Sequence, residues 1–348
     1  MARAAYIRED DFELLQVRFG IIGTNWITER FIQAAMESDQ FRLTAVYSRS
    51  QEKGSAFAAK YEPRPAVYTD ISEMAASDEV DAVYIASPNS FHAEHAMICM
   101  NHGKHVLCEK PMASNTAEVH AMMKAARENN VLLMEALKST MMPNFKAVRD
   151  NMYKLGRIRR YFAGYCQYSS RYDAFQQGTI LNAFNPEFSN GSLMDLGVYC
   201  IYPMAVLFGR PEAVKAEGIK LSSGVDGEGS LLIRYPDMDA VIMHSKISDS
   251  YLPAEIQGEN GTMVIDKINQ PYDVKIYYRD GTIEDITQSQ THESMFYELE
   301  EFIGLLETGK RESSMNSHEA TLVTAEIAEE ARRQIGLVYP ADGKNRVN

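Results

Sequence analysis

The chain has 348 residues, of which 45% are hydrophobic and 24% charged, a composition typical of a globular protein with about two domains. Its formal net charge of -13 opposes approach to nucleic acid or an anionic membrane, so neither is an expected partner. The four cysteines form no C-x-x-C pair, and the first residues lack the apolar stretch of a signal peptide. Both features indicate a reducing compartment and favour the cytoplasm.

The first 137 residues alternate between strand-like and helix-like runs. The strand-like runs are FGIIG, LTAVYS, DAVYIAS, HVLCE and VLLMEA, and the clearest helix-like runs are WITERFIQAAMES, QEKGSAFAAKY, SFHAEHAMICMNHG and NTAEVHAMMKAARENN. Such alternation predicts βαβ units and a parallel sheet. We therefore expect an α/β domain of the Rossmann type, a doubly wound parallel sheet, over residues 1–138, with residues 1–16 as an arm or extension.

The pattern changes in the second part of the chain. A helix-like run, NFKAVRDNMYKLG, precedes a long strand-like run, IRRYFAGYCQYSS, and SLMDLGVYCIYPMAVLF reads as a single helix. The most apolar helical stretch, YCIYPMAVLFG, is too short to span a bilayer. Seven short strand-like runs separated by turn signals follow between residues 214 and 287, and two helices end the chain. Residues 139–348 are thus predicted to be an α+β domain with an open, mostly antiparallel sheet for substrate binding and oligomerisation.

The turn after the first strand reads Gly23-Thr24-Asn25-Trp26-Ile27. A dinucleotide-binding turn usually has small residues spaced G-x-G-x-x-G/A, and only Gly23 fits that pattern as glycine. Asn25 tolerates the left-handed backbone conformation better than other residues, so we expect it to replace the second glycine in part. The helix that follows offers free N–H groups to a phosphate. These five residues are predicted to bind a cofactor pyrophosphate, and a plain strand–turn–helix connection is the alternative.

The second strand ends in Ser48-Arg49, without the acidic residue that holds the ribose 2′-OH in NAD-preferring proteins. Arg49 can pair with a 2′-phosphate, which a carboxylate would repel. The pair therefore favours NADP(H), with NAD as the alternative if Arg49 is only a surface residue.

Polar residues follow two further predicted strands, at the edge where ligands bind in parallel sheets. One group is Ser87-Pro88-Asn89 with His92, and the other is Glu109-Lys110-Pro111. A lysine in a desolvated pocket beside a cofactor charge is expected to have a lowered pKa, which suits it to proton handling. The predicted cofactor-binding residues here are Ser87, Pro88, Asn89, His92, Glu109 and Lys110. An exposed lysine and a polar residue at a helix start are the plainer readings of Lys110 and His92.

Asp195 and Tyr199 are four residues apart in GSLMDLGVY, which places them on one face of a helix. A phenol beside a lysine ammonium is expected to have a lowered pKa, so Tyr199 can exchange a proton with a substrate oxygen. We predict that Lys110, Asp195 and Tyr199 are catalytic. The alternative for Tyr199 is an ordinary core tyrosine.

Other residues give weaker signals. Two pairs of histidines are three apart, but no third ligand completes a zinc site, so no metal is expected. The loop before the catalytic helix contains Arg171, Tyr172 and Asn185, which we predict to reach the substrate.

Together, the segments GIIGTNWI, SPNSFH, CEKP and GSLMDLGVY resemble the Gfo/Idh/MocA oxidoreductase family over nearly the whole chain. The tyrosine form and the phrase MDLGVYCIYP resemble the branch that includes dimeric dihydrodiol dehydrogenase and NADP-dependent xylose dehydrogenase. The resemblance implies that Lys110, Asp195 and Tyr199 form the catalytic set, and that the Lys110–Pro111 peptide bond is cis.

The sequence as a whole predicts an NADP(H)-dependent oxidoreductase that transfers hydride between nicotinamide and a CH–OH or C=O carbon of a sugar or trans-diol. The alternatives are a non-catalytic NADP-sensing regulator on the same scaffold and an NAD-dependent sugar or inositol dehydrogenase. The open sheet leaves a broad face to be covered, and such faces usually mark an oligomer interface, so a homodimer or homotetramer through the C-terminal sheet is expected.

Overall fold

The structure is a computed structural model that describes residues 16–344, so all but the last residue of the predicted arm lies outside the described residues. Six parallel strands form the first sheet in the order β3-β2-β1-β4-β5-β6. They are β1 (Val17–Ile22), β2 (Phe41–Tyr47), β3 (Ala66–Tyr68), β4 (Ala82–Ile85), β5 (His105–Glu109) and β6 (Leu133–Ala136). From β1 the chain adds strands β2 and β3 on one side, and from β4 it adds β5 and β6 on the other side. The strand order therefore reverses between β1 and β4, and ligands are expected at the carboxyl ends of these two strands.

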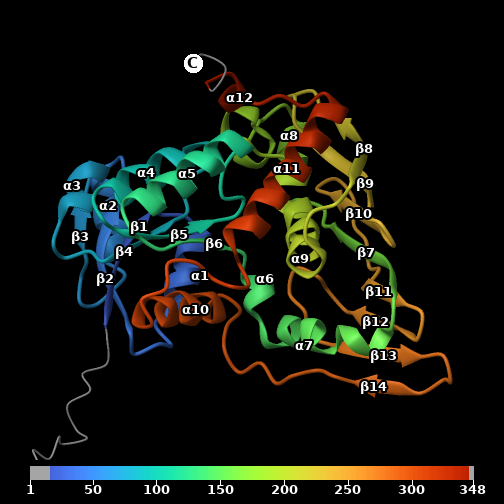
Figure 1. Cartoon of the computed structure of the whole chain (residues 1–348). Coiled ribbons are helices and arrows are strands. Elements are labelled where there is room, and N and C mark those ends of the chain that lie inside the picture. Colours follow the sequence, from blue (N-terminus) through green and yellow to red (C-terminus); the bar gives the residue numbers. More distant parts are fainter. Residues whose placement is uncertain (1–15, 345–348) are drawn as a thin grey trace, which may run out of the picture.

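Helices cover both faces of the first sheet (Figure 1). They are α1 (Trp26–Ala35), α2 (Gln51–Ala58), α3 (Ile71–Ala76), α4 (His92–Asn101) and α5 (Thr116–Glu128). On the α1 side, Phe19 and Phe31 share a buried cluster with Phe302 of α10 (Phe296–Glu307), a helix that follows the second sheet in the sequence. On the other side, α3, α4 and α5 bury their apolar faces against the same sheet.

The second sheet has eight strands in the order β14-β13-β12-β11-β7-β10-β9-β8. They are β7 (Ile158–Cys166), β8 (Ala213–Lys220), β9 (Asp226–Arg234), β10 (Asp239–Ser245), β11 (Ala254–Gly258), β12 (Gly261–Ile265), β13 (Val274–Tyr278) and β14 (Ile283–Asp285). Only the β7–β10 pair is parallel, so the predicted mostly antiparallel sheet is confirmed. The first long strand ends four residues before the predicted end, because the chain turns into the loop that contains Ser169 and Arg171.

One face of the second sheet packs on two helices, α9 (Val198–Phe208) and α11 (His318–Ile335), which lie between the two sheets (Figure 1). The remaining helices are α6 (Lys138–Met141), α7 (Pro143–Asn151), α8 (Tyr172–Gln176) and α12 (Pro340–Lys344). The stretch Pro186–Phe208 is long and apolar enough to cross a membrane by length and composition. In its most apolar window 72% of the residues are buried within the fold, as expected of a core helix.

The predicted single helix over residues 192–208 is wrong in one respect. Its first turn, Leu193–Gly197, is a π-helix that continues directly into α9. Single π turns inside helices are frequent at functional sites, and this one contains Asp195. The cis peptide bond implied for Lys110–Pro111 is present.

Candidate active site

A cavity of about 1010 Å³ lies where the carboxyl ends of the first sheet's strands meet the second sheet. It brings together most of the residues predicted from the sequence, although they come from five separate segments. The predicted residues that line it are Asn25, Trp26, Ile27, Ser87, Pro88, Asn89, His92, Glu109, Lys110, Arg171, Asp195 and Tyr199. The predicted residues that do not are Gly23, Thr24, Ser48, Arg49, Tyr172 and Asn185.

The turn after β1 has a shape that suits a dinucleotide, but Asn25 does not act as predicted. Gly23 has a φ of +106°, and a Cβ there would lie 2.6 Å from the carbonyl oxygen of Ala86, so glycine is required. Asn25 is extended, with φ -102° and ψ 179°, and is not left-handed. Its side chain accepts hydrogen bonds from the backbone N–H groups of Ile27 and Thr28, and it donates to the carbonyl of Ala86 at 2.8 Å. Asn25 is therefore the N-cap of α1 and a tie between two loops.

The end of β2 presents a free cation. Arg49 is exposed, and no hydrogen bond or ion pair of its guanidinium is found among residues 16–344. The neighbouring Ser48 is buried, and its hydroxyl accepts a hydrogen bond from the Ser50 N–H. Arg49 is thus available to an anionic ligand at this edge, whereas Ser48 shapes the turn.

His92 joins the loops after β4 and β5. Its ring is buried, with Nε2 2.7 Å from the carbonyl oxygen of Ser87 and Nδ1 2.9 Å from that of Pro111. Burial lowers the pKa of His92, so the neutral ring donates to one carbonyl only and merely contacts the other. Its ring holds the two loops together, a role the sequence did not indicate.

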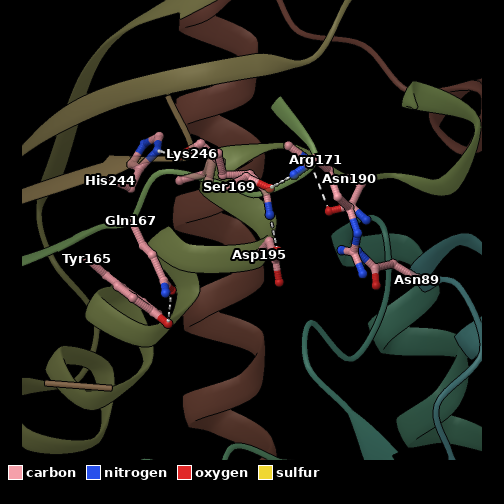
Figure 2. A network of polar contacts seen from close by, with 12 residues as sticks. Asn89, Tyr165, Gln167, Ser169, Arg171, Asn190, Asp195, His244 and Lys246 are labelled. Atoms are coloured by element: carbon pink, nitrogen blue, oxygen red, sulfur yellow. Dashed lines mark hydrogen bonds and ion pairs between the residues drawn. The ribbon is translucent and has the colours of Figure 1, made fainter. Parts of the chain in front are cut away.

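Four ionisable groups meet on one wall of the cavity. The Lys110 ammonium donates to the Asp195 carboxylate at 2.8 Å and to the Asp195 backbone carbonyl at 3.0 Å. It also lies 4.8 Å from the centre of the Tyr199 ring. On the other side of Asp195, Lys246 forms a close ion pair with the second carboxylate oxygen (Figure 2). Asp195 is thus held between two lysines.

The electrostatics of this group correct two expectations. Burial lowers the pKa of Lys110, but the Asp195 carboxylate and the neighbouring Tyr199 and Glu109 outweigh that effect, so the pKa is raised, not lowered. Burial raises the pKa of Tyr199, and the Lys110 charge offsets this only in part, so that pKa is also raised. Burial alone would raise the pKa of Asp195, but its two lysine partners hold it well below the ordinary value. At neutral pH the site therefore holds a neutral Tyr199 phenol, an ionised Asp195 carboxylate and a protonated Lys110.

The predicted substrate residues separate into two groups. Arg171 lines the cavity, and Figure 2 shows it near Asn190 and Asn89. Tyr172 instead packs against Phe175 and other aromatic rings, and Asn185 caps the short helix Pro186–Phe188 through the Glu187 N–H. The structure does not bring Tyr172 and Asn185 to the cavity, because the loop folds on its own aromatic cluster.

Several lining residues were missed by the sequence analysis. They come from the start of α6, the end of β7 and the residue after β10, and include Lys138, Tyr165, Gln167 and Lys246. Tyr165 packs edge-on against Tyr199, with 5.6 Å between ring centres. The available signal for Lys246 was a lysine near the end of the otherwise apolar run AVIMHSKIS.

Two segments of the chain match the domains of a known protein family. Residues 17–137 match the family described as "Oxidoreductase family, NAD-binding Rossmann fold", and residues 151–264 match the GFO/IDH/MocA C-terminal domain. The chain belongs to the Gfo/Idh/MocA oxidoreductase family. It is therefore an enzyme, and the alternative of a non-catalytic regulator is set aside. No group of three or more histidine, cysteine or acidic side chains that could hold a metal occurs among residues 16–344.

Individual members of the family are similar over nearly their whole length. The scyllo-inositol 2-dehydrogenase (NADP(+)) of Bacillus subtilis is 60% identical over 94% of this chain and 99% of the relative. The trans-1,2-dihydrobenzene-1,2-diol dehydrogenase of Mus musculus is 30% identical over 94% of this chain and 99% of its own. A 3-ketoreductase from Actinomadura kijaniata, solved with NADP, has the same fold, with a TM-score of 0.80 at 22% identity over 92% of this chain and 98% of that one.

Proposed function

We propose that this oxidoreductase uses NADP(H) and transfers hydride between the nicotinamide and a CH–OH or C=O carbon of a ring polyol or sugar, with scyllo-inositol as the first candidate. The observation that carries the proposal is the joint presence of Lys110, Asp195 and Tyr199 on one wall of a cavity that begins at the nucleotide turn. The 60% identity to an NADP(+)-dependent scyllo-inositol dehydrogenase supports both the cofactor and the substrate class.

The residues at the first sheet fit a dinucleotide. The backbone at Gly23 leaves room that a side chain would fill, and α1 begins there with its positive dipole end, which suits a pyrophosphate, while Asn25 occupies the N–H groups of Ile27 and Thr28. Within residues 16–344 Arg49 has no carboxylate partner, and a guanidinium pairs well with a 2′-phosphate, which favours NADP over NAD. When bound, the nicotinamide supplies the acceptor or donor of the hydride.

Tyr199 and Lys110 handle the proton. In the reducing direction the neutral Tyr199 phenol gives its proton to the carbonyl oxygen of the substrate as the carbon gains hydride and its two electrons. In the oxidising direction the phenolate takes the hydroxyl proton while the carbon loses hydride, so a C=O bond forms and one proton is released. The Lys110 ammonium stabilises the phenolate, and Asp195 keeps Lys110 in place.

The cavity suits a polyhydroxylated substrate. Besides charged side chains, its lining includes neutral polar groups, among them Asn89, Gln167, Ser169 and Asn190. Amides and hydroxyls both donate and accept hydrogen bonds, so they match the hydroxyl groups of a polyol.

A substrate and cofactor screen tests the proposal. We expect NADP+ reduction with scyllo-inositol, with slower or no reduction of NAD+. The Tyr199→Phe variant should lower kcat by about 10²- to 10⁴-fold while the Kd for NADP changes less than about twofold. The matched control is Tyr153→Phe, which alters a tyrosine that is 77% exposed and should leave both values unchanged.

Two results would contradict the proposal. Unchanged kcat in Tyr199→Phe would remove the assigned proton donor. Absence of NADP+ reduction with every inositol, pentose, hexose and cyclic diol would remove the substrate class.

A further inference from the structure

Lys246 is a buried cation in the cavity that the reaction outlined above does not use. It follows directly after β10, its side chain is only 4% exposed, and it lines the cavity. Its backbone carbonyl accepts a hydrogen bond from the Ser169 N–H at 2.9 Å, and its own N–H donates to the Gly227 carbonyl at 2.8 Å. The backbone at Lys246 is therefore fixed by β9 on one side and by the loop that follows β7 on the other.

Two lysines share a single carboxylate here. Lys110 contacts one oxygen of Asp195 and Lys246 contacts the other. Asp195 can neutralise only one of them. Glu109 lies beside Lys110 and offsets its charge in part, whereas Asp195 is the one carboxylate hydrogen-bonded to the Lys246 ammonium among residues 16–344. Burying such a charge is costly unless it gains further partners. A ligand oxygen that accepts a hydrogen bond from Lys246 would supply such a partner.

The Lys246 ammonium also has N–H donors that Asp195 does not occupy. An ammonium group has three N–H bonds, and Asp195 accepts one of them. Among residues 16–344 the ammonium has no other hydrogen bond or ion pair. Since the side chain borders the cavity, its remaining N–H groups can reach a ligand there (Figure 2).

We propose that Lys246 binds the substrate hydroxyl on the carbon next to the reacting carbon. The reacting oxygen belongs beside Tyr199 and Lys110, and the Lys110 and Lys246 ammonium groups contact the two oxygens of the same Asp195 carboxylate. On a ring polyol the oxygen at such a short separation is the vicinal one. Lys246 donates to this hydroxyl, and the hydroxyl can donate to Asp195. The inference rests on the proposed function and narrows its substrate class to vicinal diols and α-hydroxy ketones.

Two isomeric substrates isolate this contact. trans-Cyclohexane-1,2-diol has the vicinal hydroxyl, and trans-cyclohexane-1,4-diol has its second hydroxyl across the ring. For the unaltered enzyme with NADP+ we expect kcat/KM to favour the 1,2-diol by at least about tenfold, the effect of one hydrogen bond to a charged donor. Lys246→Met should reduce that ratio to about one. Lys246→Gln, which keeps a neutral donor, should give an intermediate ratio and provides a second variant if the first fails to fold. Lys275→Met removes a lysine paired with Asp273 on the far strand β13 and serves as the matched control.

The outcomes separate this inference from the proposed function. A ratio that stays high in both Lys246 variants would overturn the role of Lys246. The role of Lys246 would also be overturned if the unaltered enzyme oxidises scyllo-inositol but does not prefer the 1,2-diol. The same holds if that enzyme accepts neither diol. An unaltered enzyme that reduces NADP+ with no polyol at all would instead overturn the proposed function.

Discussion

At the scale of single residues, Asn25 and Tyr199 behave differently in the fold from what their residue types and sequence neighbours suggest. Asn25 stands where a second glycine is usual, yet it is extended and caps α1. Tyr199 lies beside a lysine, yet burial outweighs the lysine and raises its pKa. In both cases the residue type was identified correctly and its surroundings decided what it does.

The role of Asn25 as the N-cap of α1 can be tested by substitution. Replacing it by alanine removes the acceptor for the Ile27 and Thr28 N–H groups, which costs about 1 kcal/mol at an N-cap. We expect Asn25→Ala to raise the Kd for NADP about fivefold, because the turn and the start of α1 lose their fixed geometry. Asn25→Ser is the control, since serine can still cap the helix. Isothermal titration measures both, and tighter binding by Asn25→Ala or Asn25→Gly would contradict this role.

At the scale of elements, the π turn and α9 are anchored by the second sheet. The buried Asp226 of β9 accepts a hydrogen bond from the Leu193 N–H at 2.6 Å, at the start of the π turn. The buried His244 of β10 contacts the Ser192 hydroxyl through Nδ1 at 2.9 Å. Two strands thus fix the helix start that positions Asp195 and Tyr199.

Asp226 makes the stability of this anchor depend on pH. Burial raises its pKa from 3.8 to about 6, so the folded state favours the protonated acid. The preference of the folded state for protonated Asp226 contributes fully to the free energy of unfolding below about pH 4. This contribution, on the order of 3 kcal/mol, is lost as the pH rises through about 6. Asp226→Asn cannot ionise and keeps an acceptor for Leu193.

The Tm of Asp226→Asn relative to the unaltered protein should therefore rise by a few degrees between about pH 4 and pH 7. Thermal melts across this range measure the difference. Asp39→Asn, a change at an exposed aspartate, should show no such trend. A relative Tm that falls or stays constant for Asp226→Asn would show that its carboxylate is ionised throughout.

At the scale of the whole molecule, the second sheet has one covered face and one open face. Register aligns Leu232, Val241 and Phe162 across β9, β10 and β7 on the open face, with Lys215 and Glu255 on either side. Leu232 is 52% exposed. An apolar row of this kind with a charged border is typical of an interface between copies of a chain.

We predict that this face joins two or more copies of the chain. Leu232→Arg places a charge at the centre of the row and should reduce the mass measured by multi-angle light scattering toward that of one chain. Met36→Arg changes an equally exposed apolar residue after α1 and should leave the mass unchanged. An unaltered protein that is monomeric at micromolar concentration would rule the interface out.

The sequence by itself determined the features that depend on local pattern. Alternating strands and helices predicted the parallel sheet, and successive short strands predicted the second sheet. A motif at a strand end predicted Lys110 as a site residue, and the helical spacing in GSLMDLGVY predicted Asp195 and Tyr199. The two sheets could be predicted because side-chain periodicity is written along the chain, whereas the catalytic roles of Lys110, Asp195 and Tyr199 stay a prediction.

Tertiary structure alone decided what depends on segments far apart in sequence. Lys246 faces Asp195 from 51 residues away, and α10 returns to cover the first sheet. The pKa values of Lys110 and Tyr199 follow from burial and from charges on other elements. No pattern in a single stretch records such distances, so the charge balance of the site became visible only once both sheets were in place.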